Sequence, residues 1–286
     1  MKHIIAVSTN TYHGFTVDQA LEGIAAAGFK YVELTAVRNW TEHIMPDKAE
    51  HELDRVKAKM ENLGLECIAL SGHCNLTETE RLNDFRANMA LARRFGASYI
   101  ISSTGEAHFG EDEAFADDVL IENIKNLLPD LTQNGLKLGI EVHGEYGTGE
   151  AVARVVKGVD SPLVGVNFDT ANVVFYGGTD PMEDLKNCLD HVNYIHLKDK
   201  VGMDKSWNFP AIGQGELDLV GTVIGLDNII EVELSEDVLH DSAHCRKVID
   251  NEDLHILVNC HSRLQDLFRL IENFPQVFER LLRGVP

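Results

Sequence analysis

The chain has 286 residues, of which 44% are hydrophobic and 25% are charged. This balance is typical of a globular protein that buries a large core, and it excludes the charged, apolar-poor composition of disordered chains. Lys and Arg number 25 against 46 Asp and Glu, which gives a net charge of -21 that repels phosphate backbones and anionic lipids, so we expect neither nucleic acid nor a membrane as a partner.

Short apolar runs rich in Val and Ile recur along the chain, and each is followed by a polar turn and a stretch of helical periodicity. This alternation is typical of parallel strands joined by crossover helices. The expected strands are 4–8, 31–34, 66–71, 99–102, 137–142, 163–168, 192–197 and 228–234. Eight such strands predict a single α/β domain over residues 1–286, a (β/α)8 TIM barrel rather than an open doubly wound sheet.

The expected helices have recognisable ends. Helix 16–27 begins at a Thr cap and stops before Gly28, and helix 81–95 stops before Gly96. The helix that follows the sixth strand begins at Pro181, a residue that is frequent at the first helical position.

The C-terminal part departs from a regular barrel. Residues 218–228 leave room only for a short or irregular seventh helix. The tail 235–259 is atypical, since it mixes polar residues with the apolar run 254–258, and it receives no assignment. Residues 264–282 predict a terminal amphipathic helix.

The five cysteines form an odd-numbered set without the spacing of metal sites. Such a set is typical of reduced thiols rather than of a disulfide framework. The first apolar run gives way to Ser8, Thr9 and Asn10, which is too early for a signal peptide or a membrane span. The sequence therefore predicts a soluble, cytoplasmic protein.

Acidic or imidazole side chains close the last four expected strands: Glu141, Asp169, His196 and Glu231. In a barrel these ends meet at the face that carries the active site. Buried carboxylates cost several kcal/mol, as a rough estimate, unless they are paired or bound to a cation. The set is rich in oxygen and predicts one divalent-metal site, with Mn²⁺ favoured and Mg²⁺, Co²⁺ or Zn²⁺ as alternatives.

Side chains alternate along a strand, so each expected ligand has a neighbour that faces the same cavity. His143 accompanies Glu141 and Lys198 accompanies His196. Glu233 accompanies Glu231 and is the alternative to it as the fourth ligand. These neighbours are expected to contact the substrate or to support the metal ligands.

The strand ends read Glu-Val-His-Gly after strand five, Asn-Phe-Asp-Thr-Ala-Asn at strand six, His-Leu-Lys-Asp after strand seven and Ile-Glu-Val-Glu at strand eight. They resemble the sugar phosphate isomerase/epimerase group of the xylose isomerase-like barrels, as do the stretches 28–34 and 213–218. The resemblance runs from Ile4 to about Glu233. It implies metal ligation by Glu141, Asp169, His196 and Glu231, and proton transfer by the two glutamates.

The reaction expected on this basis is isomerisation or epimerisation of a sugar or sugar phosphate. The proton next to a carbonyl group is removed, and the metal stabilises the resulting enediolate. Glu141 and Glu231 are the expected acid and base. The expected substrate contacts are His73, Glu106, His143, Asn172 and Lys198. Homo-oligomer formation and phosphorylation of the sugar are left open.

Three other functions compete. A dehydratase for a cyclic polyol ketone, such as an inosose, uses the same metal site but expels a β-hydroxyl group. The endonuclease IV type of nuclease, a related branch, has a histidine where this chain has Asn172. His73 and His108 could stand near other ligands of such a nuclease, but we expect them to be loop histidines that line the cavity. A non-catalytic sugar-binding barrel ranks last because both glutamates are present.

Overall fold

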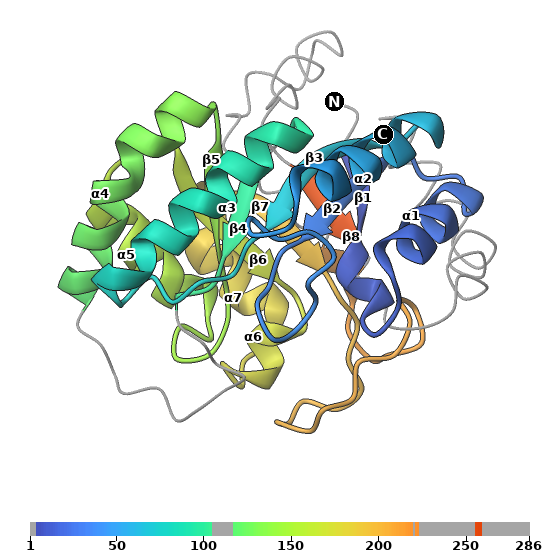
Figure 1. The fold of residues 1–286 in the computed structure, drawn as a ribbon. Coiled ribbons are helices and arrows are strands. Elements are labelled where there is room, and N and C mark those ends of the chain that lie inside the picture. Colours follow the sequence, from blue (N-terminus) through green and yellow to red (C-terminus); the bar gives the residue numbers. More distant parts are fainter. Residues whose placement is uncertain (1–3, 105–116, 220, 223–254, 259–286) are drawn as a thin grey trace, which may run out of the picture.

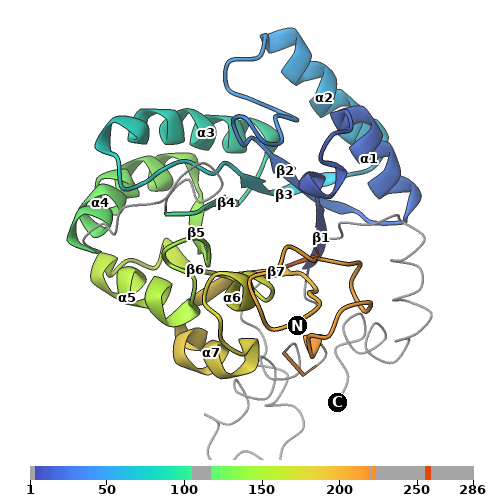
Figure 2. The same ribbon diagram turned by 90° about the horizontal axis from the view of Figure 1, so that it is seen from below.

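The computed structural model describes residues 4–104, 117–219, 221–222 and 255–258. Eight parallel strands form a closed barrel in which each strand pairs with its neighbour in chain order. Figure 2 shows helices α1 to α5 and α7 lying outside this ring of strands. The predicted (β/α)8 architecture is therefore confirmed.

Seven strands lie where the sequence predicts them, because each is a nearly continuous apolar run that a parallel sheet can bury on both faces. They are β1 (Ile4–Ser8), β2 (Tyr31–Thr35), β3 (Glu66–Ser71), β4 (Tyr99–Ser102), β5 (Lys137–Glu141), β6 (Val164–Asp169) and β7 (Val192–Leu197).

The eighth strand is a correction to the sequence-based expectation. Strand β8 is His255–Val258, and it pairs in parallel with both β7 and β1. The expected strand 228–234 was wrong as the closing strand, and those residues lie outside the described part of the chain. Both segments are short apolar runs, so the local pattern could not decide which of them completes the hydrogen bonds of β1 and β7.

The helices α1 (Val17–Ala26), α2 (Glu50–Asn62), α3 (Leu82–Phe95), α4 (Asp117–Asn134), α5 (Gly149–Val159), α6 (Asn172–Phe175) and α7 (Pro181–Cys188) connect the strands. Helix α1 opens with a capping box between Thr16 and Gln19. Helix α3 ends at Gly96, whose φ of 82° belongs to the left-handed region that glycine adopts at low cost. The expected seventh and terminal helices fall largely or wholly outside the described residues.

Alternation along the strands divides the core into two layers. Residues such as Val32, Leu138 and Ile195 pack against the helices, whereas a smaller cluster fills the barrel interior. The interior cluster contains Ala6, Ile68, Ala69, Tyr99, Ile101 and Tyr194. Towards the carboxyl ends of the strands the buried positions become polar. We therefore locate the candidate site at this end of the barrel.

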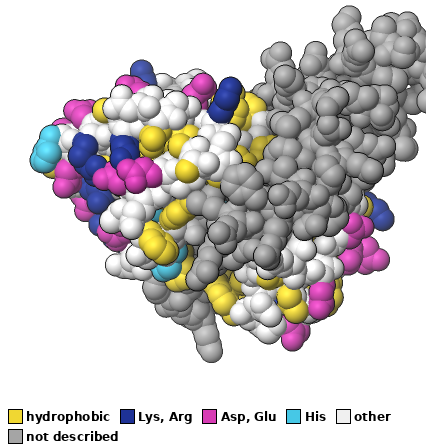
Figure 3. All heavy atoms as spheres, turned by 90° about the vertical axis from the view of Figure 1, so that its right-hand side faces the viewer, with side chains coloured by type: hydrophobic (Ala, Val, Ile, Leu, Met, Phe, Trp, Pro, Cys, Tyr) yellow, Lys and Arg dark blue, Asp and Glu magenta, His cyan; other side chains and the backbone are white. Residues whose placement is uncertain are grey.

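The outer surface of α1 and α2 carries both signs of charge. Acidic and basic side chains are interspersed on the described part of this side of the molecule (Figure 3). Arg55 pairs with Asp18 and Lys59 pairs with Glu22 between the two helices. Exposed pairs of this kind contribute little to stability. In the part of the chain that the structure describes, no helix is both long and apolar enough to cross a membrane.

Candidate metal centre

Three of the four predicted metal ligands meet at the carboxyl ends of adjacent strands. Glu141 ends β5, Asp169 ends β6 and His196 lies in β7, and their exposed fractions are 5%, 0% and 4%. One ligand atom of each lies within 4.8 Å of the others. Glu231 and Glu233 lie outside the described residues, so the fourth ligand stays a prediction.

The strand register brings these side chains together. Asp169 pairs directly with His196, and Glu141 pairs with Asn167, two residues before Asp169. Near the amino-terminal ends of the same strands, a Cβ atom on Gly165 would lie 2.4 Å from the Asn193 side chain, so a larger residue there would displace that side chain. The register of β5, β6 and β7 therefore brings the acidic and imidazole groups to the same end of the barrel.

The hydrogen bonds of Asp169 leave one oxygen turned towards the centre. Its Oδ1 accepts the backbone N–H groups of Ala171 and Asn172 at 2.9 and 2.8 Å. Its Oδ2 has no hydrogen-bond partner among the described residues, although Lys198 Nζ lies 3.2 Å away as an ion pair. A buried carboxylate oxygen in this position, next to Glu141 and an imidazole nitrogen, fits a divalent cation.

The charges at the centre are strongly coupled. Burial works to raise the pKa of Glu141, but the charges of His196 and His73 and their hydrogen bonds outweigh it and hold that pKa well below its usual range. Burial works to lower the pKa of His196, but Glu33 and Glu141 outweigh it and raise the pKa to about 10. Burial raises the pKa of Asp169 against the opposing effect of Lys198. Without a metal, His196 is therefore a cation between two carboxylates.

This arrangement predicts a pH-dependent stability for the metal-free protein. The pKa of His196 is about 10 in the folded chain against 6.5 for an ordinary histidine, so the folded state keeps a proton that the unfolded state releases. The stabilising contribution is complete below pH 6.5 and is lost as the pH rises towards 10. The free energy of unfolding should fall by up to about 1.4 kcal/mol per pH unit.

Urea denaturation of chelator-treated protein between about pH 6.5 and about pH 7.5 measures this effect before most thiols ionise in the unfolded chain. The limit matters because burial raises the pKa of Cys67 to about 12, which adds a loss of stability at higher pH. The variant His196→Gln should give a flatter profile than the wild type. Equal slopes in the two proteins would contradict the assignment of the proton to His196.

Two of the predicted substrate contacts are histidines beside Glu141. His73 Nε2 lies 2.5 Å from Glu141 Oε2, and its Nδ1 lies 2.9 Å from the Ser71 hydroxyl. His143 Nε2 lies 3.2 Å from the Tyr176 hydroxyl, and the two histidine rings meet edge to face with centroids 6.1 Å apart. The structure therefore places His73 in direct contact with the carboxylate, and His143 lies next to His73.

Asn172 and Lys198 form the other side. Lys198 Nζ donates to Asn172 Oδ1 at 2.9 Å, and Asn172 Nδ2 donates to the Val142 carbonyl at 3.0 Å. The Lys198 ammonium also lies 4.8 Å from the centre of the Phe209 ring. Glu106, the fifth predicted contact, lies outside the described residues, as does His108.

Sequence reasoning gave no role to several neighbours of this centre. Glu33 on β2 contacts His196, and Tyr176 contacts His143. Phe209 packs with Phe175 and Trp207 beside Lys198, in the segment that follows β7. Glu33 could have been found, because it is an acidic residue inside an apolar strand, but the aromatic residues carry no local signal of function.

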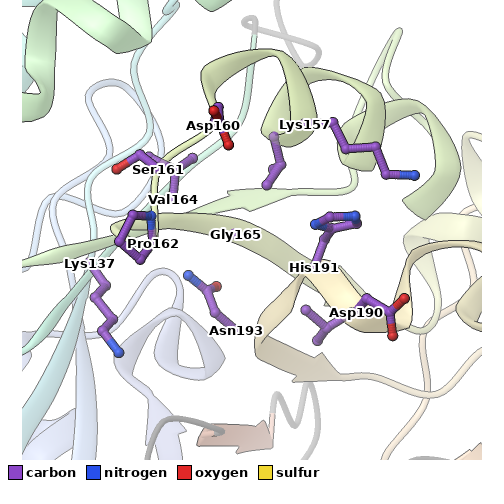
Figure 4. A pocket seen from close by; sticks show the side chains of 12 residues that line it. Lys137, Lys157, Asp160, Ser161, Pro162, Val164, Gly165, Asp190, His191 and Asn193 are labelled. Carbon is purple, nitrogen blue, oxygen red and sulfur yellow. The ribbon is translucent and has the colours of Figure 1, made fainter.

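A pocket lies at the other end of the same strands. It is lined by the first residues of β5 to β7 and by the turns that precede them, and it carries Lys157, Asp160, Asp190 and His191 (Figure 4). Chemistry in TIM barrels takes place at the carboxyl ends of the strands, not at this end. The candidate active site is therefore the cluster around Glu141.

A family model described as the xylose isomerase-like TIM barrel matches residues 21–245, which is more than half of the chain. The chain belongs to this family. An inosose dehydratase of Clostridium botulinum is 26% identical over 208 residues, a region that covers 64% of this chain and 63% of that relative. The chain thus matches less than two thirds of the relative's length.

Solved structures of other barrels show the same fold. A D-tagatose 3-epimerase-like protein superposes with a TM-score of 0.70 at 15% identity, with 100% of both chains covered. A xylose isomerase-like TIM barrel protein from Mycobacterium smegmatis, solved in complex with magnesium, gives a TM-score of 0.69 at 16% identity over 98% of both chains. At these identities the likeness concerns the fold.

Proposed function

We propose that this xylose isomerase-like barrel is a divalent-metal-dependent enzyme that removes the proton next to the carbonyl group of a sugar or polyol ketone. The observation that carries the proposal is the environment of Glu141. This carboxylate is buried, is kept ionised by two histidines and lies beside Asp169. A carboxylate at the active face of a barrel, beside a second carboxylate and a histidine, lies where it can accept a proton from a bound substrate.

Glu141, Asp169 and His196 would hold the ion, and Glu231 is the fourth ligand expected from the sequence. When bound, a divalent cation acts as a Lewis acid that stabilises negative charge developing next to a carbonyl group. The preference for Mn²⁺ over Mg²⁺, Co²⁺ and Zn²⁺ rests on the oxygen-rich donor set. It remains a prediction.

The neighbouring side chains have roles in proton transfer and in substrate binding. Glu141 accepts the proton from carbon, and His73, hydrogen-bonded to it, carries a proton to or from a substrate oxygen. Lys198 and His143 bind substrate hydroxyl or carbonyl oxygens. Asn172 holds the Lys198 ammonium in place through their 2.9 Å hydrogen bond.

Among the outcomes of this first step, we favour loss of water from a cyclic polyol ketone. The identity with inosose dehydratases supports it. So does His73, because an acid beside the base can protonate a departing β-hydroxyl group, which leaves as water. Isomerisation or epimerisation is the second candidate, with Glu231 returning the proton to another position.

The nuclease alternative has less support. Both amide atoms of Asn172 are engaged, with the Val142 carbonyl and the Lys198 ammonium, at the position where the nuclease type has a histidine. The acidic composition also disfavours a DNA partner.

A proton-exchange screen tests the proposal. Inososes, ketoses and aldoses are incubated in D₂O with the protein and Mn²⁺ or Mg²⁺, and the carbon-bound protons are followed by NMR. We expect exchange next to the carbonyl group of at least one substrate, abolished by a chelator and restored by metal. Loss of water identifies a dehydratase, and a rearranged sugar identifies an isomerase or epimerase. Exchange that persists in metal-free protein would contradict the proposal.

A further inference from the structure

Glu33 is a buried carboxylate to which the proposed reaction gives no role. It lies on β2, is 1% exposed and reaches His196 on β7, although these strands are not neighbours in the barrel. Its Oε2 lies 3.1 Å from His196 Nε2, and its Oε1 accepts a hydrogen bond from the Ser8 hydroxyl at 3.0 Å. This contact therefore crosses the barrel interior.

The two ring nitrogens of His196 face different groups. Nε2 faces Glu33, whereas Nδ1 lies 2.7 Å from Glu141 Oε1. The cluster of converging ligand atoms in the described residues contains Glu141, Asp169 and His196 but not Glu33. Only Nδ1 of the ring is thus directed at the place where an ion would bind.

A neutral imidazole binds a metal through the nitrogen that carries no proton. The hydrogen bond made by the other nitrogen decides which one that is. We propose that Glu33 is a positioning residue of the metal centre: it accepts the N–H of His196 Nε2 and so keeps Nδ1 as the nitrogen that binds the ion. This inference rests on the proposed metal site and extends it to the opposite side of the barrel.

The orientation of Glu33 supports the proposal. The Ser8 hydroxyl holds one carboxylate oxygen and leaves the other for His196, so the carboxylate has a defined plane. Ser8 and Glu33 are also paired in the register of β1 and β2, which fixes their relative height. Partners of this kind fix the orientation of a metal-binding histidine and raise the affinity for the ion.

The chain offers a matched control for a purely structural carboxylate. Asp184 is 3% exposed and accepts the backbone N–H groups of Gly149 and Glu150 at the start of α5. The change Asp184→Asn removes a buried charge as Glu33→Gln does, but away from the metal centre. A general loss of stability would affect both variants.

Calorimetric titration of the chelator-treated full chain with Mn²⁺ is the first test. Glu33→Gln should raise the dissociation constant for Mn²⁺ by about 10-fold to 100-fold. The reason is that the new amide can donate to Nε2 and favour the tautomer with the proton on Nδ1. Asp184→Asn should lower the melting temperature and leave the dissociation constant unchanged. Equal affinity of wild type and Glu33→Gln would overturn the inference.

The second test does not depend on that variant's stability. In protein loaded with diamagnetic Mg²⁺, ¹⁵N spectra of the histidine rings should show the proton of His196 on Nε2. Glu33→Asp keeps the charge but shortens the side chain, so this proton should exchange with water faster than in the wild type. A proton on Nδ1 in the loaded wild type would refute the role of Glu33. If the wild-type chain binds no ion, the proposed metal site is refuted together with this inference. If wild type and Glu33→Gln bind the ion equally tightly, only this inference is refuted.

Discussion

Replacement of Glu141 by Gln is expected to lower turnover by about 10²-fold or more while most of the metal stays bound. Glutamine has the size of glutamate and keeps one oxygen that can contact the ion, but it cannot accept a proton from carbon. In the proposed reaction Glu141 accepts the proton from its place beside Asp169 and His196, so the loss should fall on the chemical step.

Single-turnover kinetics and elemental analysis of the same sample separate the two effects. The change Glu145→Gln removes an equal charge from an exposed position in the loop after β5, and it should leave turnover unchanged. If Glu141→Gln turns over normally with metal bound, Glu141 is not the base. Lys198 or Glu233 then becomes the next candidate.

Removal of Asp169 or His196 should instead act through the metal. We expect Asp169→Ala and His196→Ala to be purified with clearly less metal than the wild type, and excess Mn²⁺ should restore part of the activity. Each change deletes one of the three converging ligand groups and leaves the other two in place.

Elemental analysis of protein purified without chelator measures the occupancy. His191→Ala is the matched control, since this histidine lies at the other end of the strands (Figure 4). Its occupancy should equal that of the wild type. Full metal content in Asp169→Ala and His196→Ala, or full activity of metal-free wild type, would show that the cluster is not the metal centre.

The seven strands from Ile4 to Leu197 could be predicted because their signal is local. Each is an apolar run of a few residues bounded by polar turns, and parallel strands buried on both faces require such runs. The same rule located Glu141, Asp169 and His196, because a polar residue at the end of an apolar strand is conspicuous. The fold class and three members of the candidate site thus follow from local pattern.

The eighth strand and the contact between Glu33 and His196 were decided by tertiary structure. Two segments of the C-terminal region have comparable apolar runs, and only pairing with both β1 and β7 selects His255–Val258. Glu33 is 163 residues from His196, and their contact exists only because barrel closure turns both side chains into one interior. Apolar periodicity reports which face of a strand or helix is buried, because residues spaced by the period of the element share one face. It cannot report which distant side chain a buried group meets, because that depends on strand order, register and closure.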